Sequence, residues 1–113
     1  MKIPAKLKKE FEELELNKGI YLLAFSGGPD SVYLLEALKS YLGDELSDII
    51  RLCYINYHDS PAVKEEEAIV NEYVDKYHLK LYRFDTKFKK GNFEDWARKY
   101  RYQRFKTIIR KEK

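Results

Sequence analysis

The fold is decided by a stretch that reads Ile20-Tyr21-Leu22-Leu23-Ala24-Phe25-Ser26-Gly27-Gly28-Pro29-Asp30-Ser31. Residues 20–25 form a short apolar run, which is typical of a strand buried on both faces of a parallel sheet. A Gly-rich turn follows, and residues 30–42 then repeat apolar side chains at helical spacing. The stretch therefore predicts a strand, a tight loop and a helix in direct succession.

The same succession repeats along the chain. Apolar runs predict further strands over residues 49–56 and 79–84, and helical periodicity predicts helices over 62–77 and 92–111. Another amphipathic helix is expected over residues 5–16. Strands that alternate with helices of this length predict an α/β fold of parallel βαβ units. Three strands make a thin sheet, so we expect the front part of a larger doubly wound fold.

Local signals predict where some of these helices begin and end. Gly19 is expected to cap the first helix in a left-handed conformation, and Gly43 to end the second. Ser60 before Pro61 is typical of a capping residue followed by proline at the first helical position.

Composition limits the class of protein. The chain has 113 residues, a net charge of +3, 44% hydrophobic residues and one cysteine, Cys53. This composition predicts one compact domain and excludes a disulfide scaffold, and the lone cysteine in an apolar strand is expected to be a small core residue. No apolar run approaches the roughly 18 residues of a membrane span. Residues Met1 to Pro4 are followed by charged residues and not by the apolar segment of a signal peptide. We therefore expect a cytoplasmic protein without membrane contact.

The charge is unevenly distributed. Residues 87–113 contain 11 basic and three acidic residues, interleaved with aromatic side chains. Such a segment suits phosphate contacts and base stacking. It equally suits an amphipathic helix that buries residues such as Ala97, Tyr100 and Ile108 and leaves its lysines in water. Both interpretations stay open at this point.

The Gly-rich loop (residues 26–31) is the strongest chemical signal. Its two glycines permit positive φ and a close approach of backbone amides to a ligand, and the start of the following helix attracts anions. Ser26 and Ser31 add hydroxyl donors. Asp30 would repel a phosphate unless a cation lies between them, which suggests Mg²⁺. The alternative is a tight strand-to-helix turn in which a serine or aspartate caps the helix.

Residues 24–31 resemble the S-G-G-x-D-S pyrophosphate loop of the N-type ATP pyrophosphatases. Enzymes of this family cleave ATP to AMP and pyrophosphate while they adenylate a substrate oxygen. The resemblance implies an adenine nucleotide alpha-hydrolase-like (PP-loop) fold. It also implies ATP binding by Ser26, Gly27, Gly28, Pro29, Asp30 and Ser31 and assigns the Mg²⁺ contact to Asp30.

A second stretch selects one branch of that family. Residues 91–105 look like the G-N-x-E-x-x-A-R-x-x-R-Y-x-x-F segment of the tRNA(Ile)-lysidine synthetases, and residues 54–57 are similar to their H-V-N-H stretch. Arg98 and Arg101 share one helix face, which the resemblance directs toward the α-phosphate, the adenylate or tRNA. Glu94 is expected to pair with Arg98 and orient it. The alternative is a solvated ion pair.

The resemblance implies a two-step reaction on ATP with Mg²⁺, L-lysine and an isoleucine tRNA that carries a CAU anticodon. The wobble cytidine's carbonyl oxygen attacks the α-phosphate and releases pyrophosphate, and the lysine amine then displaces AMP to leave lysidine. Asp30, Arg98 and Arg101 would be the catalytic residues. The alternatives are another PP-loop enzyme, such as a tRNA thiolation enzyme, or a truncated fragment that binds nucleotide or RNA without turnover.

The resemblance also predicts how the chain is divided. Residues 1–19 would be a leading helix, 20–86 the nucleotide-binding βαβ part and 87–113 a basic, aromatic loop and helix. In the family a His-His-x-x-Asp-Asp stretch follows, beyond Lys113. The chain also has His58 and two further polar residues where the family usually has Gly-Leu-Arg. We therefore expect residues 1–113 to be the N-terminal portion of a PP-loop domain.

Overall fold

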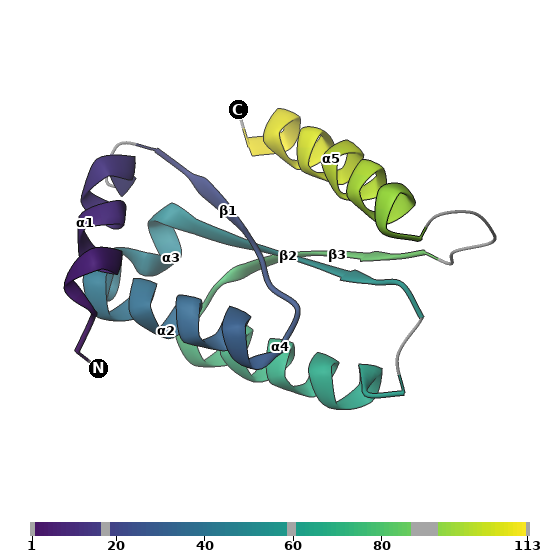
Figure 1. The fold of residues 1–113 in the computed structure, drawn as a ribbon, viewed down its shortest axis with the longest axis horizontal. Helices are drawn as coiled ribbons and strands as arrows, with labels where there is room; N and C mark the ends of the chain where they lie inside the picture. Colours follow the sequence, from purple (N-terminus) through teal and green to yellow (C-terminus); the bar gives the residue numbers. More distant parts are fainter. Residues whose placement is uncertain (1, 17–18, 59–60, 87–92, 113) are drawn as a thin grey trace.

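The sheet predicted from the sequence is present. The computed structural model describes residues 2–16, 19–58, 61–86 and 93–112. For residues 93 and 94 it describes the backbone alone. The elements are α1 (Ala5–Leu14), β1 (Tyr21–Ala24), α2 (Pro29–Leu42), the 3-10 helix η2 (Gly43–Glu45), α3 (Leu46–Ile49), β2 (Ile50–Asn56), α4 (Val63–Tyr77), β3 (Lys80–Asp85) and α5 (Phe93–Glu112). The strands form one parallel sheet in the order β1-β2-β3 (Figure 1). The α/β class and the parallel βαβ units are therefore confirmed.

The central strand β2 carries the core. Its side chains alternate between the two faces, and Ile50, Leu52 and Tyr54 on one face are all buried. The edge strand β1 pairs only with β2 among the described residues, with Leu23 beside Leu52. Tyr21 to Leu23 are only half-buried and Ala24 is exposed, so the prediction that β1 is buried on both faces is wrong. The physical reason is its position at the edge.

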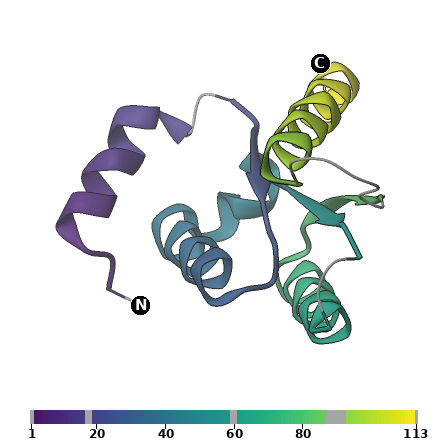
Figure 2. The ribbon, with the colours of Figure 1, turned by 45° about the vertical axis from the view of Figure 1, so that its right-hand side comes forward.

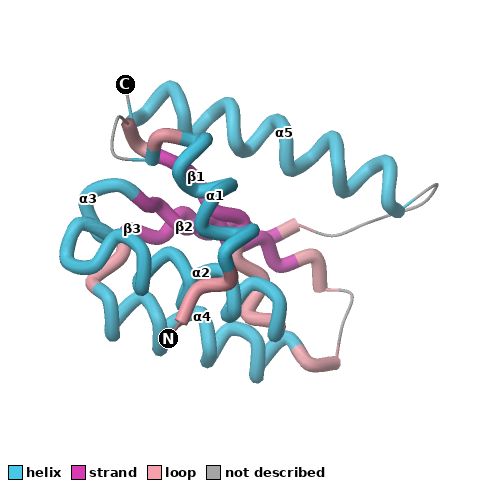
Figure 3. The backbone as a smooth tube through the Cα atoms, turned by 60° about the vertical axis from the view of Figure 1, so that its left-hand side comes forward, coloured by secondary structure: helices cyan, strands magenta, loops and turns pink. Residues whose placement is uncertain are grey.

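Helices cover both faces of the sheet. Figures 2 and 3 show α2 and α4 on one face and α5 on the other. Leu35 and Leu38 of α2 and Val70 of α4 join Leu52 in the main apolar cluster. The α1 helix extends this cluster through Phe11, which is 3% exposed. The molecule thus has three layers, and the carboxyl ends of its strands open toward one end.

The last helix bears out the amphipathic interpretation in part. Ala97 and Ile108 of α5 are buried against the sheet, as predicted, while Tyr100 is half-buried. Tyr102 points away from the core and is 61% exposed. The basic side chains Lys99 and Lys106 are exposed. The same helix therefore has a core face and a basic outer face.

Several predicted helix ends were wrong by a few residues. The α1 helix ends at Leu14, and Glu15 rather than Gly19 takes the left-handed conformation, with φ of 52°. The α4 helix begins at Val63 after Ala62, and the proposed cap Ser60 lies outside the described residues. Gly43 does end α2, with φ of 61°.

The short α3 helix was not predicted. Ile49 belongs to α3, so β2 begins one residue later than expected. Apolar side chains of this segment are buried whether the backbone is helix or strand, and periodicity over four residues does not distinguish them.

Candidate functional site

The Gly-rich loop closes on itself through its two serines. It leaves the carboxyl end of β1, where the Phe25 amide still donates to the Cys53 carbonyl at 2.9 Å. The Ser26 and Ser31 hydroxyl oxygens lie 2.9 Å apart, and the Gly28 amide donates to the Ser26 hydroxyl at 3.2 Å. These bonds fix the conformation of the loop before any ligand binds.

The start of α2 has backbone donors that no side chain uses. Pro29 is the first residue of the helix, and the Val32 amide makes the first helical bond, to the Gly28 carbonyl at 3.0 Å. Within the described residues no side chain caps this end. The Asp30 and Ser31 amides therefore remain available at the positive end of the helix dipole, which is the arrangement that binds phosphate.

Gly27 is held against helix α4. It is buried and has φ of 81°, a conformation that side chains rarely adopt. A Cβ at this position would lie 2.6 Å from the backbone carbonyl oxygen of Glu66 in α4. Only glycine fits here, so the loop conformation depends on where α4 lies.

The Asp30 side chain is free to receive a cation. It is exposed in the first turn of α2, and its carboxylate has no hydrogen-bond or ion-pair partner within the described part of the chain. The described residues contain no cluster of three His, Cys, Asp or Glu side chains that would form a complete metal site. Protein-bound Mg²⁺ usually takes only one or two carboxylates and completes its shell with phosphate oxygens and water. A single free carboxylate beside an anion site fits that mode.

The two predicted arginines of α5 occupy different places. Arg101 lines a cavity of about 140 Å³ together with Ser26 of the loop, Cys53 and Tyr57. Arg98, one turn earlier, does not line that cavity. It shares a second hollow with Arg101 and forms an ion pair with Asp95 at 3.2 Å. The fold thus brings Arg101, but not Arg98, to the cavity beside the Gly-rich loop.

The expected Glu94–Arg98 pair is not among the observed contacts, because the Glu94 side chain lies outside the described residues. Asp95 instead pairs with both Arg98 and Lys99. The hydrogen bond from Lys99, and then that from Arg98, lowers the pKa of the Asp95 carboxyl. The Arg98 and Lys99 side chains are 62% and 70% exposed and that of Asp95 is 44% exposed, so water reaches these two ion pairs. The Glu94–Arg98 pair stays a prediction.

Burial raises the pKa values of two groups that line the cavity beside the loop, Cys53 and Tyr57. Burial raises the pKa of the Cys53 thiol to about 11, so this cysteine is protonated at neutral pH and is a poor nucleophile. Burial also raises the pKa of Tyr57, and the nearby Arg101 guanidinium opposes that shift. The prediction that Cys53 is a small core residue is confirmed by its 2% exposure.

Sequence reasoning missed the role of Asn56. This residue ends β2 at the same sheet edge as the loop, is 4% exposed and donates to the Glu67 carboxylate of α4 at 2.9 Å. Beside it, His58 has φ of 57° and lies 3.5 Å from the Asp85 carboxylate. A polar residue after the apolar run from Leu52 to Ile55 is the signal that could have identified Asn56.

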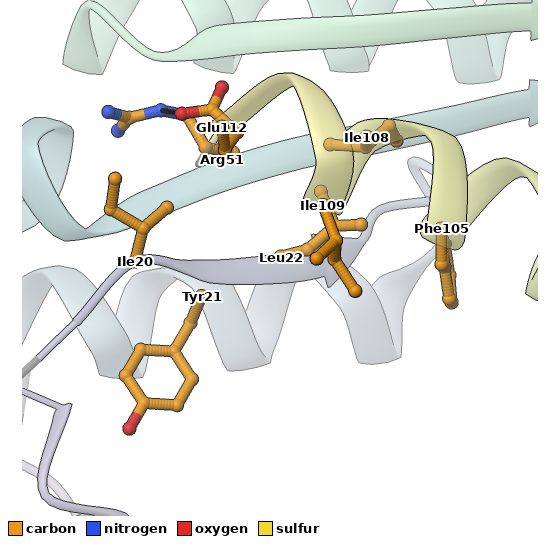
Figure 4. Close-up of a pocket in the computed structure, with 8 residues that line it drawn as sticks. All are labelled: Ile20, Tyr21, Leu22, Arg51, Phe105, Ile108, Ile109 and Glu112. Carbon is orange, nitrogen blue, oxygen red and sulfur yellow. Dashed lines mark hydrogen bonds and ion pairs between the residues drawn. The ribbon is translucent and has the colours of Figure 1, made fainter.

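A larger, more apolar cavity lies away from this site. It has about 440 Å³ and borders the outer edge of β1 at the amino ends of the strands (Figure 4). Leu22 of β1 and Ile109 of α5 are among the residues that line it, and Arg51 and Glu112 form an ion pair at 3.3 Å at one end (Figure 4). The predicted site residues do not line this cavity, and its apolar walls offer little to a phosphate.

Comparison with known proteins identifies the family. The family model described as the PP-loop domain matches residues 1–113. The chain belongs to the PP-loop domain family. Its three parallel strands and the Gly-rich loop after β1 agree with that assignment.

Curated relatives share one name. The chain is 41% identical over 95 residues to a tRNA(Ile)-lysidine synthase of Malacoplasma penetrans, an alignment that covers 78% of this chain and 30% of that protein. It is 36% identical over 101 residues to the protein of the same name from Wolinella succinogenes, an alignment that covers 89% of this chain and 29% of that protein. The PP-loop chain thus spans about a third of the length of these relatives. No solved structure is significantly similar to it. None of the described helices is long and apolar enough to cross a membrane.

Proposed function

We propose that this PP-loop chain is the N-terminal, nucleotide-binding portion of a tRNA(Ile)-lysidine synthase. The observation that carries the proposal is the Gly-rich loop, whose serines fix its shape while the amides of Asp30 and Ser31 stay available for phosphate. The shared name of the relatives supports the choice of substrates. Ile20 beside β1 and Ile109 of α5 are large apolar side chains that are exposed. Their exposure supports the proposal that another part of the whole protein covers the β1 edge of the sheet.

The loop would hold the pyrophosphate leaving group of ATP. The backbone donors at the start of α2 and the hydroxyl groups of Ser26 and Ser31 would bind its oxygens, which is mostly positioning and electrostatic stabilisation. Asp30 would hold Mg²⁺, which supplies positive charge to neutralise the phosphates. Arg101, which borders the loop, would face the α-phosphate, and Arg98 would face the adenylate or tRNA.

The reaction would proceed in two steps, adenylation of the cytidine and then displacement of AMP by lysine. The carbonyl oxygen of the wobble cytidine forms a bond to the α-phosphorus, and the bond to pyrophosphate breaks. The lysine amine then forms a C–N bond, loses a proton and displaces AMP. ATP, L-lysine and the isoleucine tRNA are thus the proposed substrates, in the cytoplasm.

Titration of the protein with ATP and Mg²⁺ tests the nucleotide site. We expect binding, and we expect Asp30→Ala to weaken it about tenfold, because one charged contact is lost. Asp44→Ala is the matched control, since Asp44 is also exposed and begins a helical segment. Equal ATP affinity of wild type and Asp30→Ala at saturating Mg²⁺ would exclude the metal role of Asp30.

Incorporation of labelled lysine tests the reaction. We expect a protein that contains this chain to transfer lysine to an isoleucine tRNA transcript only with ATP. AMP release that depends on a sulfur donor instead of lysine would favour a thiolation enzyme. ATP binding without AMP formation by that protein would favour a non-catalytic fragment.

A further inference from the structure

Asn56 joins three segments at the carboxyl edge of the sheet. Its side-chain amide donates to the Glu67 carboxylate at 2.9 Å, and its side-chain oxygen accepts the His58 amide at 2.9 Å. Its backbone oxygen accepts the Thr86 amide at 2.9 Å. A buried amide that lost these partners would be costly, because water does not reach it. Helix α4 and the ends of β2 and β3 are therefore tied to one residue.

Glu67 is the α4 residue that makes this connection. The oxygen that accepts from Asn56 also accepts from the Arg83 guanidinium at 2.8 Å. Charged hydrogen bonds of this kind are stronger than neutral ones. The Glu67 side chain thus fixes the position of the first turns of α4 against β2 and β3.

The same part of α4 supports the Gly-rich loop. Glu66, the neighbour of Glu67, presents the backbone carbonyl that a Cβ on Gly27 would meet at 2.6 Å. Gly27 has no side chain to adjust this contact, so a shift of α4 is transmitted directly to the loop backbone. Phosphate binding by oriented backbone amides is sensitive to such small displacements.

We propose that Glu67 is a positioning residue for the Gly-rich loop. It acts through its hydrogen bond to Asn56, which holds the Glu66 backbone where Gly27 rests on it. This inference depends on the proposed function, in that the loop is taken to bind the phosphates of ATP. Glu67 itself touches no residue of the loop in the observed contacts.

Paired variants distinguish positioning from simple stabilisation. Glu67→Ala removes the connection, whereas Glu65→Ala removes an exposed carboxylate from the first turn of the same helix. Arg83→Met removes the ion pair and leaves the Asn56 bond. Glu67→Asp keeps the charge but shortens its reach, and it serves as the second variant where Glu67→Ala does not fold.

The experiment measures ATP–Mg²⁺ affinity well below each unfolding temperature and the amide NMR signals of Gly27 and Gly28 without ligand. We expect Glu67→Ala and Glu67→Asp to weaken affinity about tenfold and to shift both signals. Glu65→Ala and Arg83→Met should stay within about twofold of wild type. Glu67→Gln should retain most of the affinity, because its amide oxygen still accepts from Asn56.

Two results would overturn the inference. One is unchanged affinity with unchanged Gly27 and Gly28 signals in Glu67→Asp. The other is a loss in Arg83→Met equal to that in Glu67→Ala, since the ion pair alone would then matter. If wild type binds no ATP, the proposed function fails, and the NMR comparison still decides whether Glu67 sets the loop conformation.

Discussion

The two ends of the parallel strands differ in the size of their cavities and in the polar groups that remain available for a ligand. The carboxyl end has a cavity of only about 140 Å³, yet it carries the Gly-rich loop and Arg101. The amino end has the cavity of about 440 Å³, but Glu112 there already binds Tyr82, Lys80 and Arg51. Uncommitted backbone donors, rather than cavity size, mark the end where a phosphate is expected to bind.

The largest expected effect follows from Gly27→Ala at the carboxyl end. The new Cβ would combine a strained φ with overlap onto the Glu66 carbonyl. We expect ATP binding to be lost and the free energy of unfolding to fall by about 3 kcal/mol. Calorimetric ATP titration and denaturant unfolding measure the two quantities.

Two other glycines provide controls for Gly27→Ala. Gly28→Ala would place a Cβ 3.4 Å from the Ser26 hydroxyl oxygen, which is ordinary contact, and Gly43→Ala would add strain in open space. We expect Gly43→Ala to keep the ATP affinity of wild type. Gly28→Ala lies in the loop itself and should lower ATP affinity less than Gly27→Ala does, because it meets no backbone clash. If Gly43→Ala abolished ATP binding as fully as Gly27→Ala, the contrast between the two ends would fail.

A smaller effect is expected from Arg101→Ala. Arg101 borders the loop, so its loss should weaken ATP affinity about fivefold at constant Mg²⁺. Arg110→Ala, in the exposed last turn of α5 at the amino end, is the matched control and should change affinity little. Equal effects of the two substitutions would indicate a general influence of charge instead of a contact.

Glu112→Gln is expected to have no effect on nucleotide binding and to change only the stability of the fold. The hydrogen bond from Tyr82, followed by that from Lys80, lowers the pKa of this carboxyl from 4.5 to about 2. The folded state therefore favours the ionised form, and its stabilisation is present above about pH 4.5 and lost as pH falls toward 2. Thermal unfolding of wild type and Glu112→Gln should differ at pH 6 and converge near pH 2.

Glu45→Gln, an exposed carboxyl in η2, is the control for Glu112→Gln and should leave the unfolding temperature nearly unchanged across that range. A change in ATP affinity in Glu112→Gln would break the separation of roles between the two ends. A difference from wild type that persists at pH 2 would show that the stabilisation does not come from the ionised carboxylate.

Local sequence signals predicted the elements better than their ends. Apolar periodicity located the strands and long helices because it reflects which side chains are buried. It did not predict that Glu15 would take the left-handed conformation expected of Gly19, nor that α4 would begin at Val63. A difference of one or two residues at a helix end costs little, so tertiary contacts decide it.

The sequence alone determined the α/β order and the Gly-rich loop between β1 and α2, because glycine, serine and proline act locally on the backbone. Tertiary structure decided that Gly27 rests on α4, that Arg101 and not Arg98 borders the loop, and that Asn56 ties α4 to the sheet. Those contacts join residues far apart in the chain, and packing of α4 and α5 on opposite faces of the sheet brings them together (Figure 2).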